Sequence, residues 1–172
     1  VGAAVSSKLC DRKIYKNNMF IRNKAVKRAA AIISQIIVLF YISHCFFDNN
    51  RQNEGTLYIT DCGMIIIEQT TFLKNNAQTQ AIVYADIFER MFSIKNNFDQ
   101  NKEAGLIEIS KGNFYYDIKD YYTKNVGTQG TSIQLNDVEN SLLVSIVVDK
   151  NFASNTAGPI YAYDCKIFKI IN

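Results

Sequence analysis

The sequence is poor in several residue types, and each shortage argues against a class of protein. It holds one proline, one histidine and no tryptophan in 172 residues. No segment combines helical spacing with caps at both ends, so helical repeats are not expected. Without a Cys-x-x-Cys pair the chain lacks zinc-ligand spacing, and we expect no metal or other cofactor. The net charge is only +3, with one basic cluster at 22–28 and the other lysines spread through turns, so we expect no nucleic-acid partner.

What the sequence does contain is a repeat that runs along the whole chain. An aromatic or aliphatic residue stands three positions before an asparagine, which a basic residue usually precedes. These anchor residues, separated by 26, 26, 21, 29 and 26 positions, are Asn23, Asn49, Asn75, Asn96, Asn125 and Asn151. A short alternating apolar segment follows each anchor, as at 55–59 and 105–109, and this pattern is typical of a half-buried strand. Repeats of this length mark chains in which each unit buries its apolar face against its neighbours.

Two or three short strands per repeat, joined by tight turns, predict an all-β parallel β-helix of six to seven rungs. We expect the whole chain, residues 1–172, to form one such segment. The anchor asparagines should occupy sharp turns and stack as a ladder of amides. The aromatic residues before them should stack inside the helix, and these are Phe20, Phe46, Phe72 and Tyr122. Because the repeat is already running at Val1 and still running at Asn172, we expect an uncapped part of a longer chain, with adjacent rungs of that chain as its nearest partner.

The repeat resembles that of the polymorphic outer membrane protein family. The resemblance lies in a phenylalanine, an asparagine three residues on and an alanine two beyond that, as in Phe20-Asn23-Ala25 and Phe72-Asn75-Ala77. Related right-handed, pectin-lyase-like β-helices occur in large surface or membrane proteins of protists. The resemblance therefore implies a right-handed β-helix at a cell surface or in association with a membrane. The rungs at Asn96 and Asn125 depart from the motif.

One segment permits a different interpretation. Residues 29–47 carry no formally charged side chain at neutral pH and follow the basic cluster, so by length they could form a transmembrane helix. The same segment is in phase with the repeat at both ends, which favours a rung. An integral membrane protein with a helix at 29–47 stays the second alternative.

Catalytic signals are sparse. β-Helical enzymes that act on polysaccharides resemble one another in placing acidic groups on adjacent rungs, and the candidates here are turn residues, namely Asp61, Asp86, Asp137 and Asp164. Aspartate is also an ordinary turn residue, because its side chain caps backbone amides. The lone His44 lies in an apolar run. Cys10 and Cys62 occupy equivalent positions two rungs apart, too far for a disulfide, so we expect free and largely buried thiols.

The leading functional prediction is a non-catalytic scaffold or adhesion segment of a large surface or membrane-associated protein. A polysaccharide hydrolase or lyase-like enzyme is the alternative. For the scaffold we predict an exposed row that contacts a carbohydrate or a protein surface ligand. Its members are Tyr58, Val83, Glu108, Ile133 and Tyr161, of which Tyr58, Glu108 and Tyr161 are the proposed contacts.

Overall fold

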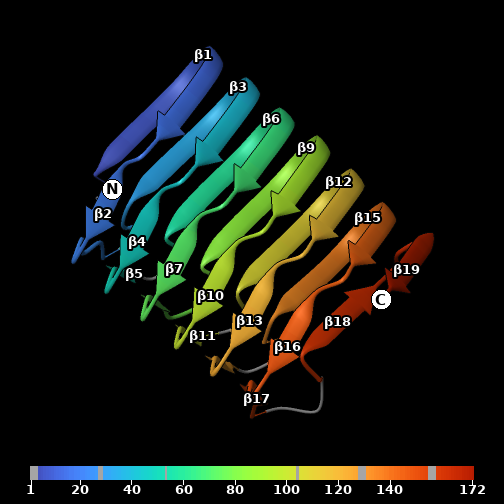
Figure 1. Ribbon diagram of the computed structural model, residues 1–172. Helices are drawn as coiled ribbons and strands as arrows, with labels where there is room; N and C mark the ends of the chain where they lie inside the picture. Colours follow the sequence, from blue (N-terminus) through green and yellow to red (C-terminus); the bar gives the residue numbers. More distant parts are fainter. Residues whose placement is uncertain (1–3, 27–28, 53, 104, 128–130, 155–157) are drawn as a thin grey trace.

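The computed structural model describes residues 4–26, 29–52, 54–103, 105–127, 131–154 and 158–172. Within these residues every regular element is a β-strand, and the chain winds through six complete turns and part of a seventh. Each turn, here called a rung, lies parallel to the one before it (Figure 1). The predicted parallel β-helix is therefore confirmed.

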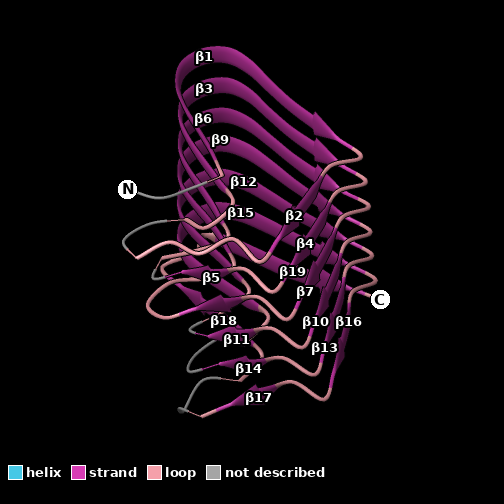
Figure 2. Cartoon of the chain, turned by 90° about the vertical axis from the view of Figure 1, so that its left-hand side faces the viewer, coloured by secondary structure: helices cyan, strands magenta, loops and turns pink. Residues whose placement is uncertain are grey.

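Each of the six rungs contributes one long strand and two short ones, except that the first has an isolated bridge at Lys24 in place of its second short strand. Equivalent strands pair into three parallel sheets. The first sheet contains β1 (Val5–Lys16), β3 (Ile32–Ser43), β6 (Leu57–Glu68), β9 (Val83–Ile94), β12 (Ile107–Ile118) and β15 (Ile133–Val144), followed by β18 (Ile160–Tyr163) and β19 (Ile167–Ile171) in the last rung. The second contains β2 (Met19–Ile21), β4 (Phe46–Asp48), β7 (Thr71–Leu73), β10 (Asn97–Asp99), β13 (Tyr121–Thr123) and β16 (Val147–Asp149). The third contains β5 (Arg51–Gln52), β8 (Asn76–Ala77), β11 (Lys102–Glu103), β14 (Val126–Gly127) and β17 (Phe152–Ala153). Figure 2 shows the long strands arching over the top of the stack, with the shorter strands closing the rung below.

Three bends in each rung are made by residues with positive φ, and these residues align from rung to rung. We call such a set of equivalent positions a column. One column lies within the long strands, a second follows them, and a third separates the second sheet from the third. The third column consists of Arg22, Asn49, Lys74, Gln100, Lys124 and Lys150, with φ between 51° and 54°. Left-handed backbone turns the chain sharply at each of these positions.

The core is built from inward-facing columns. Leu57, Ile59, Ile107 and Ile109 are fully buried, whereas in the last rung Ile160 is partly exposed and Ala162 is exposed. Rings of one column stack face to face, with centroids 4.7 to 5.1 Å apart. They belong to Phe20, Phe47, Phe72, Phe98 and Tyr122. The prediction of Phe46 in this column was wrong by one residue, since Phe46 points outward beside buried Phe47.

A glycine makes one of the close contacts in this core. The aromatic ring of Phe88 lies over Gly112 on the next rung, where a Cβ would meet ring atom Cζ at 2.0 Å. Cys10, Ile37 and Cys62 share the same column, so an isoleucine separates the two thiols, as the register predicts. All four cysteines are free, and Cys45 and Cys62 are buried.

The asparagine ladder exists, but two predicted members lie outside it. Its hydrogen-bonded column consists of Asn23, Asn50, Asn75, Asn101, Asn125 and Asn151. Asn49 is exposed and occupies the positive-φ position one residue earlier. Asn96 lies at a different corner, where its Oδ1 accepts a hydrogen bond from the Thr70 backbone N–H at 2.9 Å. Both errors have the same cause. Asn49 is adjacent to Asn50, and Asn96 and Asn97 lie close to Asn101, so the sequence offers more than one plausible anchor at each place.

The ladder residues make sharp turns possible without occupying left-handed conformations themselves. Each inner amide oxygen accepts from the backbone N–H and the Nδ2 of the preceding ladder residue, as Asn75 does from Asn50 at 3.1 and 2.9 Å. Each Nδ2 also donates to a backbone carbonyl on the preceding rung, as Asn75 does to Phe47 at 2.9 Å. Backbone groups at the corner are thereby satisfied inside the core, where an unpaired group would be costly.

Residues 29–47 form part of the β-helix rather than a helix. They contain β3, which pairs with β1 and β6 in the first sheet, and the start of β4. The alternative of a helical membrane span at 29–47 is therefore wrong. A search of the described residues finds no helix long and apolar enough to cross a membrane.

Candidate functional site

The most distinctive surface feature is a groove along the corner between the second and third sheets. The buried asparagine ladder forms its floor, and the residues immediately before and after each asparagine form its two sides. Because the ladder fixes the turn on every rung, these flanking residues are presented at a constant spacing. That spacing is 4.7 to 5.1 Å, measured between the stacked rings just before the corner.

Cations line this groove on five successive rungs. They alternate between the two sides, so that one side carries Arg22, Lys74 and Lys124 and the other carries Lys24, Arg51 and Lys102. We call these six residues the basic groove. Among the described residues none of the six forms an ion pair. Most lysines are spread over other parts of the surface, as expected, but Lys24, Lys74, Lys102 and Lys124 gather with Arg22 and Arg51 along this one corner.

Three adjoining hollows make up the groove. The largest, about 420 Å³, lies between Arg51, Lys74, Lys102 and Lys124 and is also lined by asparagine and glutamine amides. Two further hollows of about 360 and 320 Å³ continue it toward the first rung and share Arg51 with it. No carboxylate and no aromatic ring is among the residues that line these three hollows in the described part of the chain.

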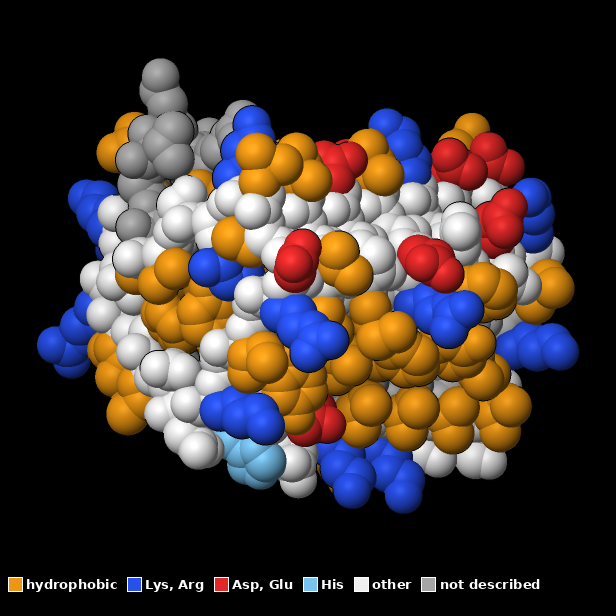
Figure 3. Space-filling model, turned by 90° about the horizontal axis from the view of Figure 1, so that it is seen from above, with side chains coloured by type: hydrophobic (Ala, Val, Ile, Leu, Met, Phe, Trp, Pro, Cys, Tyr) orange, Lys and Arg blue, Asp and Glu red, His pale blue; other side chains and the backbone are white. Residues whose placement is uncertain are grey.

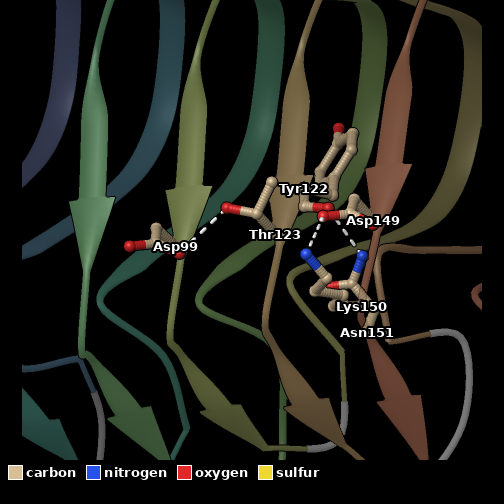
Figure 4. Close-up of polar contacts among 6 residues, drawn as sticks. All are labelled: Asp99, Tyr122, Thr123, Asp149, Lys150 and Asn151. Carbon is tan, nitrogen blue, oxygen red and sulfur yellow. Dashed lines mark hydrogen bonds and ion pairs between the residues drawn. The ribbon is translucent and has the colours of Figure 1, made fainter.

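Acidic residues lie close by, but they face the outer surface of the second sheet. Asp48, Asp99 and Asp149 precede the positive-φ residues, at the ends of β4, β10 and β16. Figure 4 shows Thr123 donating a hydrogen bond to Asp99 on the preceding rung, at 2.9 Å, and Lys150 beside Asp149 at 3.5 Å. Lys150, on the sixth rung, is thus paired, and the basic groove ends at Lys124.

The predicted exposed row is only partly correct in its membership. Tyr58, Tyr84, Glu108, Gln134 and Tyr161 form one outward column of the first sheet. Val83 and Ile133 instead face inward and are fully buried, because the predicted alignment slipped by one residue. The rings of Tyr58 and Tyr84 stack on each other with centroids 5.0 Å apart, so each ring covers one face of the other. Burial raises the pKa of the Glu108 carboxyl, and nearby Asp86 adds to this effect.

The turn acids do not gather into a row on adjacent rungs. Asp61, Asp137 and Asp164 share a column, but Ile87 and Lys111 stand between the first two. Asp86 belongs to the neighbouring column, opposite Thr60. Only Asp137 and Asp164 are neighbours along that edge.

A pair of carboxyl groups does occur, but it is inside the core. Asp117 and Asp120 are fully buried near the β12–β13 corner. The Oδ2 of Asp117 accepts hydrogen bonds from the hydroxyls of Tyr122 and Tyr115, and Asp120 accepts from Ser93 and from the backbone N–H of Asn96 at 2.7 Å. Burial raises the pKa of both carboxyls, to about 6 for Asp120, and the charge of Asp120 raises that of Asp117 further. Since neither carboxyl is exposed, the pair cannot meet a polysaccharide in this conformation.

The sequence carried a signal for the basic groove that was not followed. A basic residue usually precedes the anchor asparagine, and in the correct register that position becomes one side of the groove. The position after each asparagine forms the second side of the groove. The basic residues at this position align only when Asn50 and Asn101 are taken as the anchors. Groups of histidine, cysteine and acidic residues that could hold a metal ion are not found among the described residues.

Comparisons of the chain with protein-family models, with curated proteins and with solved structures find no match. The likeness to the polymorphic outer membrane repeat thus stays a resemblance of short motifs.

Proposed function

We propose that this β-helix is a non-catalytic binding scaffold whose basic groove holds a linear, negatively charged polysaccharide. The observation that carries the proposal is the presence of an unpaired cation on each of five successive rungs, beside hollows that no carboxylate lines. An extended polyanion lying along the axis would meet a new positive charge at every rung. Binding of this kind releases counterions and depends strongly on salt.

The chemistry between the cations favours a glycan over a nucleic acid. Proteins that hold single-stranded nucleic acids without reading their sequence combine cations with aromatic side chains on which bases stack. The groove offers amides instead, including Asn49, Asn76 and Gln100. Asn49 and Gln100 each already donate one hydrogen bond, to Asp48 and Asp99, and keep their amide oxygens and a second N–H. Amides donate to and accept from hydroxyl groups, which a carboxylated or sulfated sugar chain supplies along its length.

A rigid array of charges at constant spacing also suits the role of a scaffold. Stacked rungs hold the backbone of these residues in place before the ligand arrives, so little loop ordering accompanies binding. We further propose that the segment belongs to a larger surface or membrane-associated protein, in which adjacent rungs would extend the groove. Contact of Tyr58, Glu108 and Tyr161 with a second ligand stays a prediction.

The polysaccharide-cleaving alternative is less well supported than binding. Glycoside hydrolysis requires two carboxyl groups that face one bound sugar. The basic groove has no carboxylate lining, and the carboxyl pair with raised pKa values, Asp117 and Asp120, is buried.

The test is binding of a fluorescent sulfated oligosaccharide to the protein, followed by anisotropy over a range of salt concentrations. We expect the triple variant Lys74→Gln/Lys102→Gln/Lys124→Gln to bind much more weakly and to lower the logarithmic salt slope by about one for each lysine removed. The matched control is Lys95→Gln/Lys111→Gln/Lys119→Gln, which removes the same charge from exposed positions at other corners.

Four outcomes contradict the proposal or part of it. Equal binding by the groove variant and the control variant would remove the groove as the site. Tighter binding of an oligothymidine of equal charge would replace the glycan by a nucleic acid. If neither polyanion binds at low salt, the basic groove is not a polyanion-binding site. Shortening of the oligosaccharide during incubation would restore the enzyme alternative.

A further inference from the structure

A second surface, on the first sheet just before the corner that follows the long strands, is largely apolar, with Arg90 and Glu68 as the charged residues in its columns. It lies on the outer side of the second half of β3, β6, β9, β12 and β15. Its eleven partly exposed apolar side chains are Leu39, Tyr41, Met64, Ile66, Phe92, Ile94, Phe114, Tyr116, Ile118, Leu142 and Val144. We call them the apolar face. Figure 3 looks onto it and shows hydrophobic side chains gathered in rows along the axis.

The rows are ridges that run parallel to the axis of the β-helix. The middle ridge consists of Tyr41, Ile66, Phe92, Tyr116 and Leu142, and the rings of Phe92 and Tyr116 stack with centroids 5.1 Å apart. A furrow of about 150 Å³ separates it from the neighbouring ridge between Phe114 and Leu142. Ridges of this kind fit into the furrows of a surface that has the same parallel corrugation. A second copy of the chain supplies that surface when the two axes are parallel or antiparallel.

The charges at the margins distinguish these two arrangements. One margin carries exposed Lys95 and Lys119. At the other margin Glu89 pairs with Arg90 and Glu139 pairs with Lys166, so these four charges cancel. With antiparallel axes the lysine margins of the two copies would face each other and repel. With parallel axes, related by a two-fold axis along the β-helix, each lysine margin faces the margin whose charges are paired, and the repulsion between lysines is avoided.

We infer that the apolar face is the interface of a two-fold dimer of this chain with parallel axes. From the spacing of strands and the rise along them, the face covers on the order of 500 Å² on each copy, and a dimer would bury roughly 1,000 Å², near the lower limit for a specific interface. A lipid surface is the less suitable occupant, because it has no furrows to receive the ridges.

The first experiment is sedimentation velocity of the unliganded protein at a series of concentrations. We expect a reversible dimer, and we expect Phe92→Lys, which puts a charge at the centre of the face, to weaken dimerisation by at least about tenfold. The matched control is Tyr121→Lys, which replaces an aromatic side chain that is 52 % exposed on the second sheet. A monomer at every concentration overturns the inference, as does a dimer that Phe92→Lys leaves intact while circular dichroism shows it folded.

A second experiment tests the orientation with surface cysteines. In a Cys10→Ser/Cys165→Ser background, Glu89→Cys and Lys95→Cys proteins are prepared separately and treated, alone or mixed, with a bismaleimide that spans about 10 Å, the separation of two packed sheets. With parallel axes the mixture should form a cross-linked pair and neither protein alone should do so. Cross-linking of Lys95→Cys with itself would overturn the parallel arrangement. Binding of the wild-type monomer to anionic vesicles, abolished by Phe92→Lys, would replace the second copy by a lipid surface.

Discussion

Two buried polar columns support corners of the same β-helix in different ways. The asparagine ladder repeats one uncharged side chain on six rungs, and each inner member makes the same set of hydrogen bonds. At the preceding corner the equivalent residues are unlike one another, and include Cys45, Thr70, Asn96 and Asp120. Asp120 lies beside Asp117, whose Oδ1 has no hydrogen-bond partner among the described residues.

The two columns differ in whether a buried side chain can ionise. In the ladder every rung depends on its neighbours in the same way, and nothing in the column can ionise. In the cluster an acidic side chain performs the capping role of an amide and introduces a buried charge. The ladder should therefore be insensitive to pH, whereas the cluster should make the fourth and fifth rungs sensitive to it.

The largest effect is expected from a break in the ladder. Asn75→Ala removes hydrogen bonds to Asn50, Asn101 and the Phe47 carbonyl and leaves buried backbone groups unpaired. We expect the free energy of unfolding to fall by roughly 3–5 kcal/mol, measured by urea denaturation. Asn76→Ala, next in sequence and partly exposed, is the control and should cost less than about 0.5 kcal/mol. Equal losses in both variants would refute the structural role of the ladder.

The next effect is the pH dependence of stability. Burial raises the folded-state pKa of Asp120 from 3.8 to about 6, so its proton stabilises the folded protein below about pH 4 and this stabilisation is lost as pH rises through 6. At about 1.4 kcal/mol for each pKa unit, the loss from Asp120 is on the order of 3 kcal/mol, and the raised pKa of Asp117 acts in the same direction.

Urea midpoints measured from pH 4 to pH 7 should therefore fall as pH rises, with the contribution of Asp120 lost by about pH 6. Asp120→Asn keeps an oxygen that can accept from the Asn96 backbone and makes this column resemble the ladder, so the decline should become smaller. A stability curve that is flat or rises over this range in the wild-type protein would contradict the buried acid cluster.

A smaller effect should follow from Tyr122→Phe, since Tyr122 belongs both to the ring stack and to the acid cluster. The variant keeps the ring but removes the hydroxyl that donates to Asp117. We expect a loss of about 1–2 kcal/mol at neutral pH and a steeper decline with pH, because this hydrogen bond lowers the pKa of Asp117. Denaturation at two pH values measures both effects. Tyr115→Phe, which removes a hydroxyl 3.2 Å from the same oxygen, is the comparison.

The smallest effect on stability is expected beside the ladder, in the basic groove. Lys74→Gln/Lys102→Gln/Lys124→Gln changes exposed side chains that flank buried asparagines. Its free energy of unfolding should stay within about 0.5 kcal/mol of the wild-type value while glycan binding is lost. A large loss of stability in this variant would mean that the corner needs its cations as well as its amides.

The sequence predicted the architecture because alternation within strands and recurrence of the anchor are both local signals. The predicted register of the ladder was wrong where two asparagines are adjacent or close together in the sequence. From the start of the long strand to the end of the second short strand, every rung with both short strands has the same length, as between Leu57 and Ala77 or Ile107 and Gly127. All variation in rung length falls in the connection that follows. If 21 positions of each rung are aligned without gaps and only this connection varies in length, Asn50 and Asn101 fall at the ladder position.

The surfaces were harder to predict than the fold, because a column exists only when the register is correct. A slip of one residue moved Val83 and Ile133 to the outer surface and hid the alternation of Arg51 and Lys74 across the ladder. The apolar face was missed for another reason. Outer positions such as Ile66 and Ile118 are as apolar as the inner ones, so these strand halves do not alternate.

The direction of the backbone hydrogen bonds has a mechanical consequence. In all three sheets these bonds run along the axis, so a force that pulls the two ends of the stack apart opens one rung at a time rather than shearing many bonds together. Each rung that opens exchanges about 5 Å of folded length for roughly 80–90 Å of extended chain. Stretched along its axis, the β-helix would act as an extensible tether that yields in steps and absorbs work with each rung.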